Sequence, residues 1–186
     1  MHGVTEVCPE CQFDPSAELD PVERFATFAK RYPVPLTRLL KTDSADVLRT
    51  RPDDTTWSAL EYVGHMVGVC DTTVGWIERT IAEDEPAFSG SDVDEEIRLG
   101  QFNDVAPADM AARIAAAAGA TSARLSSLEP DVLDRTASFG GVTAPLRLFI
   151  VAMIHEGHHH LLDVGRVLRT VRTQASEDQH SERSQT

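Results

Sequence analysis

Hydrophobic residues recur at steps of three and four along most of the chain, which predicts an all-α protein of four helices. No stretch shows the sustained alternation of a strand, so we expect no sheet. The first predicted helix spans residues 21–31 and begins with proline, which the first helical turn tolerates. Pro33 and Pro35 then interrupt the pattern, which resumes as far as Leu48. We therefore expect this first element to be kinked or split.

The second predicted helix covers about residues 58–83 and has the clearest core stripe. Ser58 and Glu61 stand at the spacing of a capping box. Six residues alternate steps of four and three, as in a helix packed at a shallow angle in a bundle: Val63, Val67, Cys70, Val74, Ile77 and Ile81. The seven acidic residues between positions 83 and 96 favour a solvated connection after this helix.

Two further helices are predicted in the second half of the chain. Residues 107–128 are rich in alanine and form the third. After a turn at residues 140–141, Thr143 can cap a fourth helix with Pro145 near its first position. This helix is expected to run to about Thr170. It is apolar nearly all round, so a histidine-rich stretch lies inside an otherwise buried segment.

The chain length suits one compact domain with flexible ends. It has 186 residues, of which 41% are hydrophobic. We expect an N-terminal extension over residues 1–19, a four-helix bundle over residues 20–172, and a disordered polar tail over residues 173–186.

Net charge restricts the possible partners. Seventeen Lys and Arg face 30 Asp and Glu, for a formal charge of -13. Such a surface repels phosphate backbones and anionic lipids, so neither nucleic acid nor membrane is an expected partner. No apolar run approaches the roughly 20 residues that span a bilayer, and the start of the chain lacks the features of a signal peptide. A cytoplasmic protein is expected.

The three cysteines, Cys8, Cys11 and Cys70, are too few for a disulfide framework, which favours a reducing compartment. Cys8 and Cys11 form a C-x-x-C pair that can chelate zinc or form a disulfide. A structural zinc site needs two further ligands. His2 and Cys70 could supply them only if the N-terminus docked on the bundle, while Cys70 already occupies the core stripe.

Five of the seven histidines fall in two predicted helices, and they are the main candidates for chemistry. His155 and His159 project within about 40° of each other, one turn apart, as two imidazoles on one metal would. His158 lies within about 60° of His155 on its other side. Both partners remain open, and the smaller angle favours His159. His160 points elsewhere, and His65 belongs to the second helix.

A third imidazole would complete a three-histidine site with a position open for water or substrate. His65 is the candidate inside a neighbouring helix. It lies about 160° around that helix from the middle of the core stripe. If His65 binds metal beside the fourth helix, the stripe should therefore pack against a different helix or against a second subunit of a homodimer.

Two segments resemble the DinB/YfiT-like family: Trp57-Ser-Ala-Leu-Glu-Tyr-Val-Gly-His65 and, some ninety residues later, His155-Glu-Gly-His-His159-His-Leu-Leu-Asp-Val. The similarity covers roughly residues 20–170. It implies a four-helix bundle in which His65, His155 and His159 bind a divalent metal. A set of three imidazoles suits Zn²⁺ or Ni²⁺.

The wider superfamily includes metal-dependent transferases that use bacillithiol or mycothiol, and mycothiol-dependent maleylpyruvate isomerases. The resemblance implies a metal-dependent thiol S-transferase whose partners are a low-molecular-weight thiol and a small electrophile. Family members often carry a Gly-Gln-Ile type sequence after the last histidine, where this chain has Leu161, Leu162 and Asp163. A nonenzymatic metal-binding stress-response protein and a metal-activated hydrolase are alternative interpretations.

Overall fold

The computed structural model describes residues 7–15, 20–90 and 92–184, and most of them are helical. The α-helices are α1 (Pro21–Arg31), α2 (Pro33–Thr42), α3 (Ala45–Arg49), α4 (Ala59–Ala82), α5 (Val93–Gly100), α6 (Pro107–Ser126) and α7 (Leu146–Ser184). The strands are β1 (Ala87–Phe88), β2 (Thr136–Phe139) and β3 (Val142–Pro145), and two 3₁₀ turns span Phe102–Asp104 and Pro130–Asp134.

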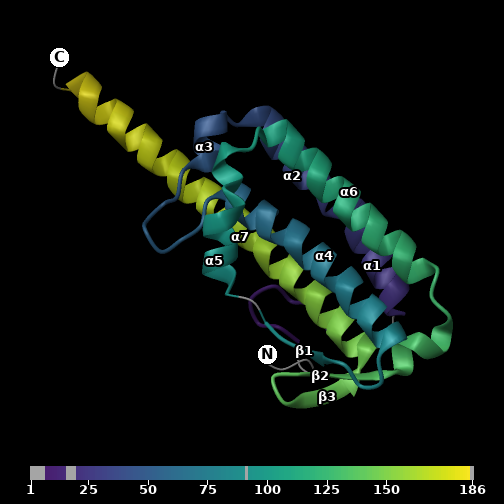
Figure 1. Cartoon of the computed structure of the whole chain (residues 1–186). Helices are drawn as coiled ribbons and strands as arrows, with labels where there is room; N and C mark the ends of the chain where they lie inside the picture. The colour runs from purple at the N-terminus through teal and green to yellow at the C-terminus, as the bar shows by residue number, and fades with distance from the viewer. Residues whose placement is uncertain (1–6, 16–19, 91, 185–186) are drawn as a thin grey trace.

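Four helical layers form a bundle, as the sequence predicts (Figure 1). The consecutive helices α1 and α2 together form the first member of the bundle, and α4, α6 and α7 are the other three. Helix α6 packs against α4, α1 and α2, while α7 packs against α4 and α1. The predicted break at the proline pair is confirmed, because α1 ends at Arg31 and α2 begins at Pro33.

Helix α4 begins with the predicted capping box. The Ser58 hydroxyl accepts a hydrogen bond from the Glu61 amide, and the Glu61 carboxylate accepts one from the Ser58 amide at 2.8 Å. The core stripe of α4 faces α6, since the Thr121 hydroxyl of α6 donates to the Cys70 carbonyl at 3.3 Å. Ile81, the last residue predicted for the stripe, is exposed at the end of the helix. The opposite side of α4 is thereby free to face α7, which is the arrangement that a functional His65 requires.

A small sheet covers one end of the bundle and was not predicted (Figure 1). Strand β2 pairs with β1 in parallel and with β3 in antiparallel orientation, and the β2–β3 turn holds Gly140 and Gly141 at positive φ. Thr143 and Pro145 therefore lie in β3 and do not cap the last helix, which begins at Leu146. Strands of two to four residues are too short to show alternation in the sequence.

The connection after α4 is also more ordered than predicted. Residues 83–96 contain β1 and the start of α5, whose N-cap is Asp92. The Phe88 side chain of β1 stacks on Trp76 of α4, with ring centroids 4.8 Å apart. This contact fixes the acidic segment to the bundle, because a buried aromatic pair outweighs the solvation of its neighbours.

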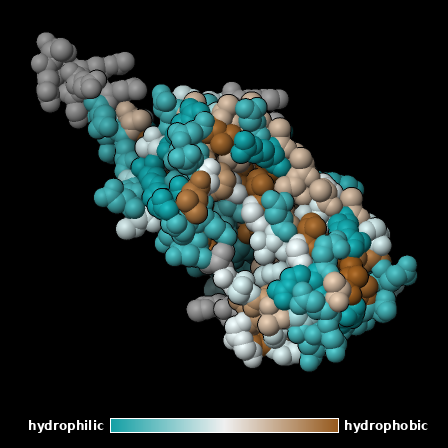
Figure 2. Space-filling model, in the orientation of Figure 1, coloured by the Kyte–Doolittle hydropathy of each residue, from teal (hydrophilic) through white to brown (hydrophobic). Residues whose placement is uncertain are grey.

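Helix α7 extends past the predicted end at Thr170, and residues 173–184 of the expected disordered tail are helical. Its last turns stand clear of the bundle (Figure 1). Arg172 forms a two-pronged ion pair with Asp43, at 2.8 and 2.6 Å, which anchors α7 beside the end of α2. Polar residues dominate the face shown in Figure 2, and hydrophobic residues form separate spots on it. None of the described helices is long and apolar enough to cross a membrane.

Candidate metal sites

Helix α7 presents potential metal ligands on two faces. His155 and His159 are one turn apart and lie beside Cys8 and Cys11, whereas Glu156 and His160, also one turn apart, lie beside His65 of α4. Successive residues of a helix point about 100° apart, so the two pairs serve different neighbours. We call the first set, Cys8, Cys11, His155 and His159, the N-terminal group. The second set, His65, Glu156 and His160, is the α4–α7 group.

The three ligands predicted from the sequence are divided between these groups. His65 lies in one, while His155 and His159 lie together in the other. The physical reason is the rotation of α7, which turns Glu156 and His160 toward α4 and turns the predicted pair toward the N-terminal segment. The described structure thus does not bring His65, His155 and His159 into a single group.

In the α4–α7 group, one carboxylate oxygen lies between two imidazoles. Oε1 of Glu156 is 3.1 Å from Nε2 of His160 and 3.8 Å from Nε2 of His65. One ligand atom from each of the three residues lies within 4.8 Å of the other two. The His65 ring is nearly buried, whereas the Glu156 side chain is 47% exposed. Two imidazoles and a carboxylate are a donor set that suits zinc and similar divalent ions.

Asp163 orients the His160 ring. Its Oδ2 lies 3.3 Å from Nδ1 of His160, which leaves Nε2 facing Glu156 and His65. A carboxylate on the far nitrogen fixes the tautomer and ring orientation of a metal-binding histidine. Aromatic rings pack around the group, with Tyr62 at 5.2 Å from His160 and Trp57 at 5.5 Å from His65 between centroids.

Electrostatics in the α4–α7 group favour a cation among its side chains. Hydrogen bonds from His160 and His65 hold the pKa of Glu156 far below its usual value. Burial by itself lowers the pKa of His160, but Asp163 and Glu156 outweigh it and raise that pKa to about 9. Nδ1 of His65 is buried and has no hydrogen-bond partner among the described residues. A divalent ion fits this set, because it would balance the two carboxylates without a proton on the rings.

A pocket of about 500 Å³ opens beside His65 and Glu156. Its walls come from α4, the segment after β1, α5, the sheet and α7, and include Trp76, Phe139 and Phe149. Among the described lining residues there is no Lys or Arg. The pocket therefore combines an aromatic wall with access to two of the three potential ligands, and offers no cationic anchor for a carboxylate or phosphate.

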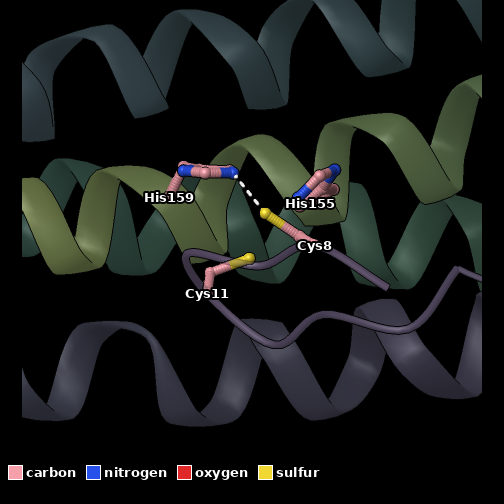
Figure 3. A group of neighbouring side chains, drawn as sticks. All are labelled: Cys8, Cys11, His155 and His159. Atoms are coloured by element: carbon pink, nitrogen blue, oxygen red, sulfur yellow. Dashed lines mark hydrogen bonds between the residues drawn. The ribbon is translucent and has the colours of Figure 1, made fainter. Parts of the chain in front are cut away.

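The N-terminal group joins the C-x-x-C pair to the predicted H-x-x-x-H pair. Sγ of Cys8 lies 3.1 Å from Nε2 of His159, and the His155 and His159 ring centroids are 4.8 Å apart. Figure 3 shows the loop with both cysteines crossing beside α7, with the two sulfurs directed to the histidines. A backbone hydrogen bond at Cys11 lowers the pKa of Cys8 to about 6, against the opposing effect of its desolvation.

The remaining candidates lie outside both groups. His158 packs against Phe13 and Phe28, with centroid distances of 5.2 and 6.3 Å, and partial desolvation lowers its pKa. Of the two open partners for His155, the structure therefore groups His159 with it. Cys70 is in the core, where burial raises its pKa to about 12. His2 lies outside the described residues.

Glu156 and His160 are potential ligands that the sequence did not predict. The signal was present, because they have the same four-residue spacing as His155 and His159. A site built from imidazoles alone does not include it, since Glu156 offers a carboxylate in place of a histidine ring.

A helical bundle with potential metal ligands on two of its helices is the class that this fold and these groups define. The family model of the DinB superfamily matches residues 35–162, well over half of the chain. The chain therefore belongs to the DinB superfamily, which confirms the resemblance found in the sequence. Among curated proteins, no sequence matches the chain.

Two solved structures share the fold. One is YfiT from Bacillus subtilis, described as a probable metal-dependent hydrolase with an unusual four-helix bundle topology; its TM-score is 0.72 at 16% identity, over 84% of this chain and 92% of YfiT. The other is a mycothiol-dependent maleylpyruvate isomerase, with a TM-score of 0.62 at 16% identity over 80% of this chain. The match spans 62% of that enzyme, less than two thirds of its length.

Proposed function

We propose that this chain is a metal-dependent enzyme that transfers a low-molecular-weight thiol to a small uncharged electrophile. His65, Glu156 and His160 hold the metal in this proposal. The observation that carries it is the convergence of these three side chains beside the pocket of about 500 Å³. This assignment revises the three-histidine site expected from the sequence, because Glu156 and His160 replace His155 and His159.

Three protein ligands are the number found in catalytic zinc sites, where a further coordination position stays open. A divalent ion in such a site supplies the positive charge that deprotonates a thiol at neutral pH. The protein residues have separate tasks. Asp163 keeps Nε2 of His160 available, and Trp57 and Tyr62 restrict water around the imidazoles.

The pocket composition favours uncharged substrates. Trp76, Phe139 and Phe149 offer apolar surface, whereas Glu96 and Glu156 give the lining an acidic character. Carboxylates and phosphates normally require a cationic anchor, and the described lining has none. The electrophile should therefore be uncharged in this part of the site.

Hydrolysis is the second candidate, and the similarity to YfiT favours it. Water is a weaker acid than a thiol, so its attack gains more from a positioned general base. Glu96 is the titratable lining residue outside the α4–α7 group in the described pocket. A Glu96→Gln change should reduce hydrolysis roughly 10²-fold or more, but should alter thiol transfer little.

The test measures turnover of metal-loaded protein with a panel of low-molecular-weight thiols and neutral electrophiles, beside a panel of neutral esters and amides. We expect thiol transfer that chelation abolishes and that Glu156→Gln reduces strongly. Glu129→Gln, on an exposed residue, is the matched control and should retain full activity. Transfer that survives both chelation and Glu156→Gln would contradict the proposal, and metal binding without turnover would favour the nonenzymatic alternative.

A further inference from the structure

The N-terminal group has no role in the function proposed above, although it gathers four strong metal ligands. We propose that Cys8, Cys11, His155 and His159 form a structural zinc site that fastens the N-terminal segment to α7. The site is separate from the α4–α7 group, because the two sets share no residue and lie on different faces of the helix. It therefore stands or falls independently of the proposed enzyme activity.

The geometry of the N-terminal group approaches that of a tetrahedral zinc site. Zinc bonds of about 2.3 Å to sulfur and 2.0–2.1 Å to nitrogen place the ligand atoms of a tetrahedron roughly 3.3–3.8 Å apart. In the structure, the four ligand atoms lie within 4.8 Å of one another, and Sγ of Cys8 is 3.1 Å from Nε2 of His159. Small side-chain rotations suffice to reach the required distances.

Backbone hydrogen bonds within the loop that carries the cysteines hold it in a tight turn. The Gln12 amide donates to the Cys8 carbonyl and the Cys8 amide donates to the Phe13 carbonyl, each at 2.9 Å. Gln12 adopts a left-handed conformation, with φ of 58°, directly after Cys11. This reversal brings both sulfurs to the same side of the loop, facing α7 (Figure 3).

The Phe13 ring holds the other half of the site in place. It stacks on His155 at 4.9 Å between centroids, with an angle of 10° between the planes. The Arg24 guanidinium of α1 lies 4.6 Å from the Phe13 ring centroid, and Arg24 also donates to the Asp14 carbonyl. The loop is thus seated between α1 and α7 with its cysteines beside the two histidines (Figure 3).

The donor types select zinc and a closed site. Two thiolates and two imidazoles at tetrahedral spacing are the Cys₂His₂ set of structural zinc centres, in which all four positions are filled by protein. Two thiolates also balance the charge of Zn²⁺, which suits a partly buried location. Nε2 of His155 is buried and has no hydrogen-bond partner in the described part of the chain, so a metal would satisfy an otherwise orphaned acceptor.

A metal also explains how this short segment stays on the bundle. Residues 7–15 contain no helix or strand, and their buried apolar surface comes mainly from Cys8 and Phe13. So small a contact offsets little of the conformational entropy lost when the loop is ordered. Zinc binding supplies the missing free energy, as it does in small domains that fold only with metal.

The experiment combines zinc analysis with zinc X-ray absorption on the full chain, purified under reducing conditions and loaded with Zn²⁺. We expect two zinc ions per chain and a sulfur shell at about 2.3 Å. The Cys8→Ser, Cys11→Ser double variant should lose one zinc ion and the whole sulfur shell. Cys70→Ala changes the third cysteine and should retain both signals.

A second variant separates this site from the proposed catalytic one. Glu156→Gln with His160→Gln should lose the other zinc ion and keep the sulfur shell. A wild-type chain with one zinc ion and two sulfur neighbours would support the structural site while contradicting the catalytic group. Zinc without sulfur neighbours in the wild type, or a Cys8–Cys11 disulfide in place of zinc, would overturn the structural site, and neither result depends on a variant that must fold.

Discussion

His155 and Glu156 are adjacent in the chain, yet they belong to different groups of potential metal ligands. His155 lies beside the cysteines of the N-terminal loop, and Glu156 lies beside His65 of α4. The turn of about 100° between successive helical residues produces this division. One helix can thereby contribute an i, i+4 pair to each of two sites without any break in its backbone.

Asp163 should control the metal affinity of the α4–α7 group through its contact with His160. Asp163→Asn weakens the acceptor for Nδ1 of His160, so we expect divalent-metal affinity to fall roughly 10- to 100-fold. Competition with a chelator of known affinity measures the change. Asp131→Asn, on an exposed residue, is the control and should leave the affinity unchanged. Equal divalent-metal affinities for Asp163→Asn and Asp131→Asn would show that Asp163 does not support metal binding.

Gly157 of α7 lies against the Phe28 side chain of α1, and a side chain there should destabilise the fold. A Cβ atom would lie 2.4 Å from the Phe28 ring and 3.2 Å from the end of Met66. We expect Gly157→Ala to lower the free energy of unfolding by roughly 1–3 kcal/mol, because overpacking outweighs the gain in helix propensity. Denaturant unfolding measures this value.

Gly165 gives a matched control on the same helix. The nearest atom to a Cβ there is the flexible end of Arg169, at 3.8 Å. Gly165→Ala should therefore stabilise the protein by about 0.5–1 kcal/mol. A stabilising effect of Gly157→Ala equal to that of Gly165→Ala would show that α7 and α1 are not packed as described.

The cap of α4 should contribute measurably to stability. Ser58 is buried, accepts from the Glu61 amide and donates to the Asn103 side chain at 2.7 Å. Ser58→Ala should reduce the free energy of unfolding by about 1–2 kcal/mol, since it leaves both partners unsatisfied. Ser126→Ala, near the end of α6 and exposed, should change it by less than about 0.5 kcal/mol. Similar losses for the two variants would contradict the role of the cap.

The ion pair of Asp43 with Arg172 should make stability depend on pH. Hydrogen bonds from Arg172 hold the pKa of Asp43 below its ordinary value in the folded state. The stabilisation is therefore complete above the pKa of the unfolded chain, near 4, and is lost as pH falls through the lower folded pKa. We expect the free energy of unfolding of wild type to exceed that of the Asp43→Asn variant by about 1 kcal/mol at pH 7.

The difference in the free energy of unfolding between wild type and Asp43→Asn should disappear at acid pH. There the Asp43 carboxyl is protonated and, like the asparagine side chain that replaces it, carries no charge. Unfolding curves at several pH values test this, with exposed Asp71→Asn as the control that shows little difference at any pH. A difference that did not decrease as the pH fell below about 4 would have to arise from something other than the charge of Asp43. It would also weaken the view that this pair anchors the C-terminal part of α7.

The bundle could be predicted from the sequence because its helices carry strong local signals. Ser58 with Glu61 marks the start of α4, and the proline pair marks the break between α1 and α2. The sheet could not be predicted, because β1–β3 are short. The extension of α7 could not be predicted either, because Arg172 is held by Asp43, which lies 129 positions earlier in the chain. Tertiary contacts of this kind leave no periodic pattern.

The candidate site could be predicted only in part. The spacing of potential ligands along one helix is visible in the sequence, but which ligands on different segments come together is not. The pairing of His155 with His159 followed from helical geometry, and the structure places them together. Which face of α7 meets His65 depends on the rotation of one helix against another, which no residue spacing encodes. The approach of the C-x-x-C loop to α7 likewise depends on contacts between distant segments.

The most direct test of the central claim is anomalous X-ray diffraction at the zinc edge from crystals of the zinc-loaded chain. We expect an anomalous peak for a zinc ion that is bound by His65, Glu156 and His160 at distances of about 2.0–2.2 Å. Measured above and below the edge, the signal distinguishes zinc from other ions. A zinc peak bonded to His65, His155 and His159 together, or no peak beside Glu156, would contradict the account.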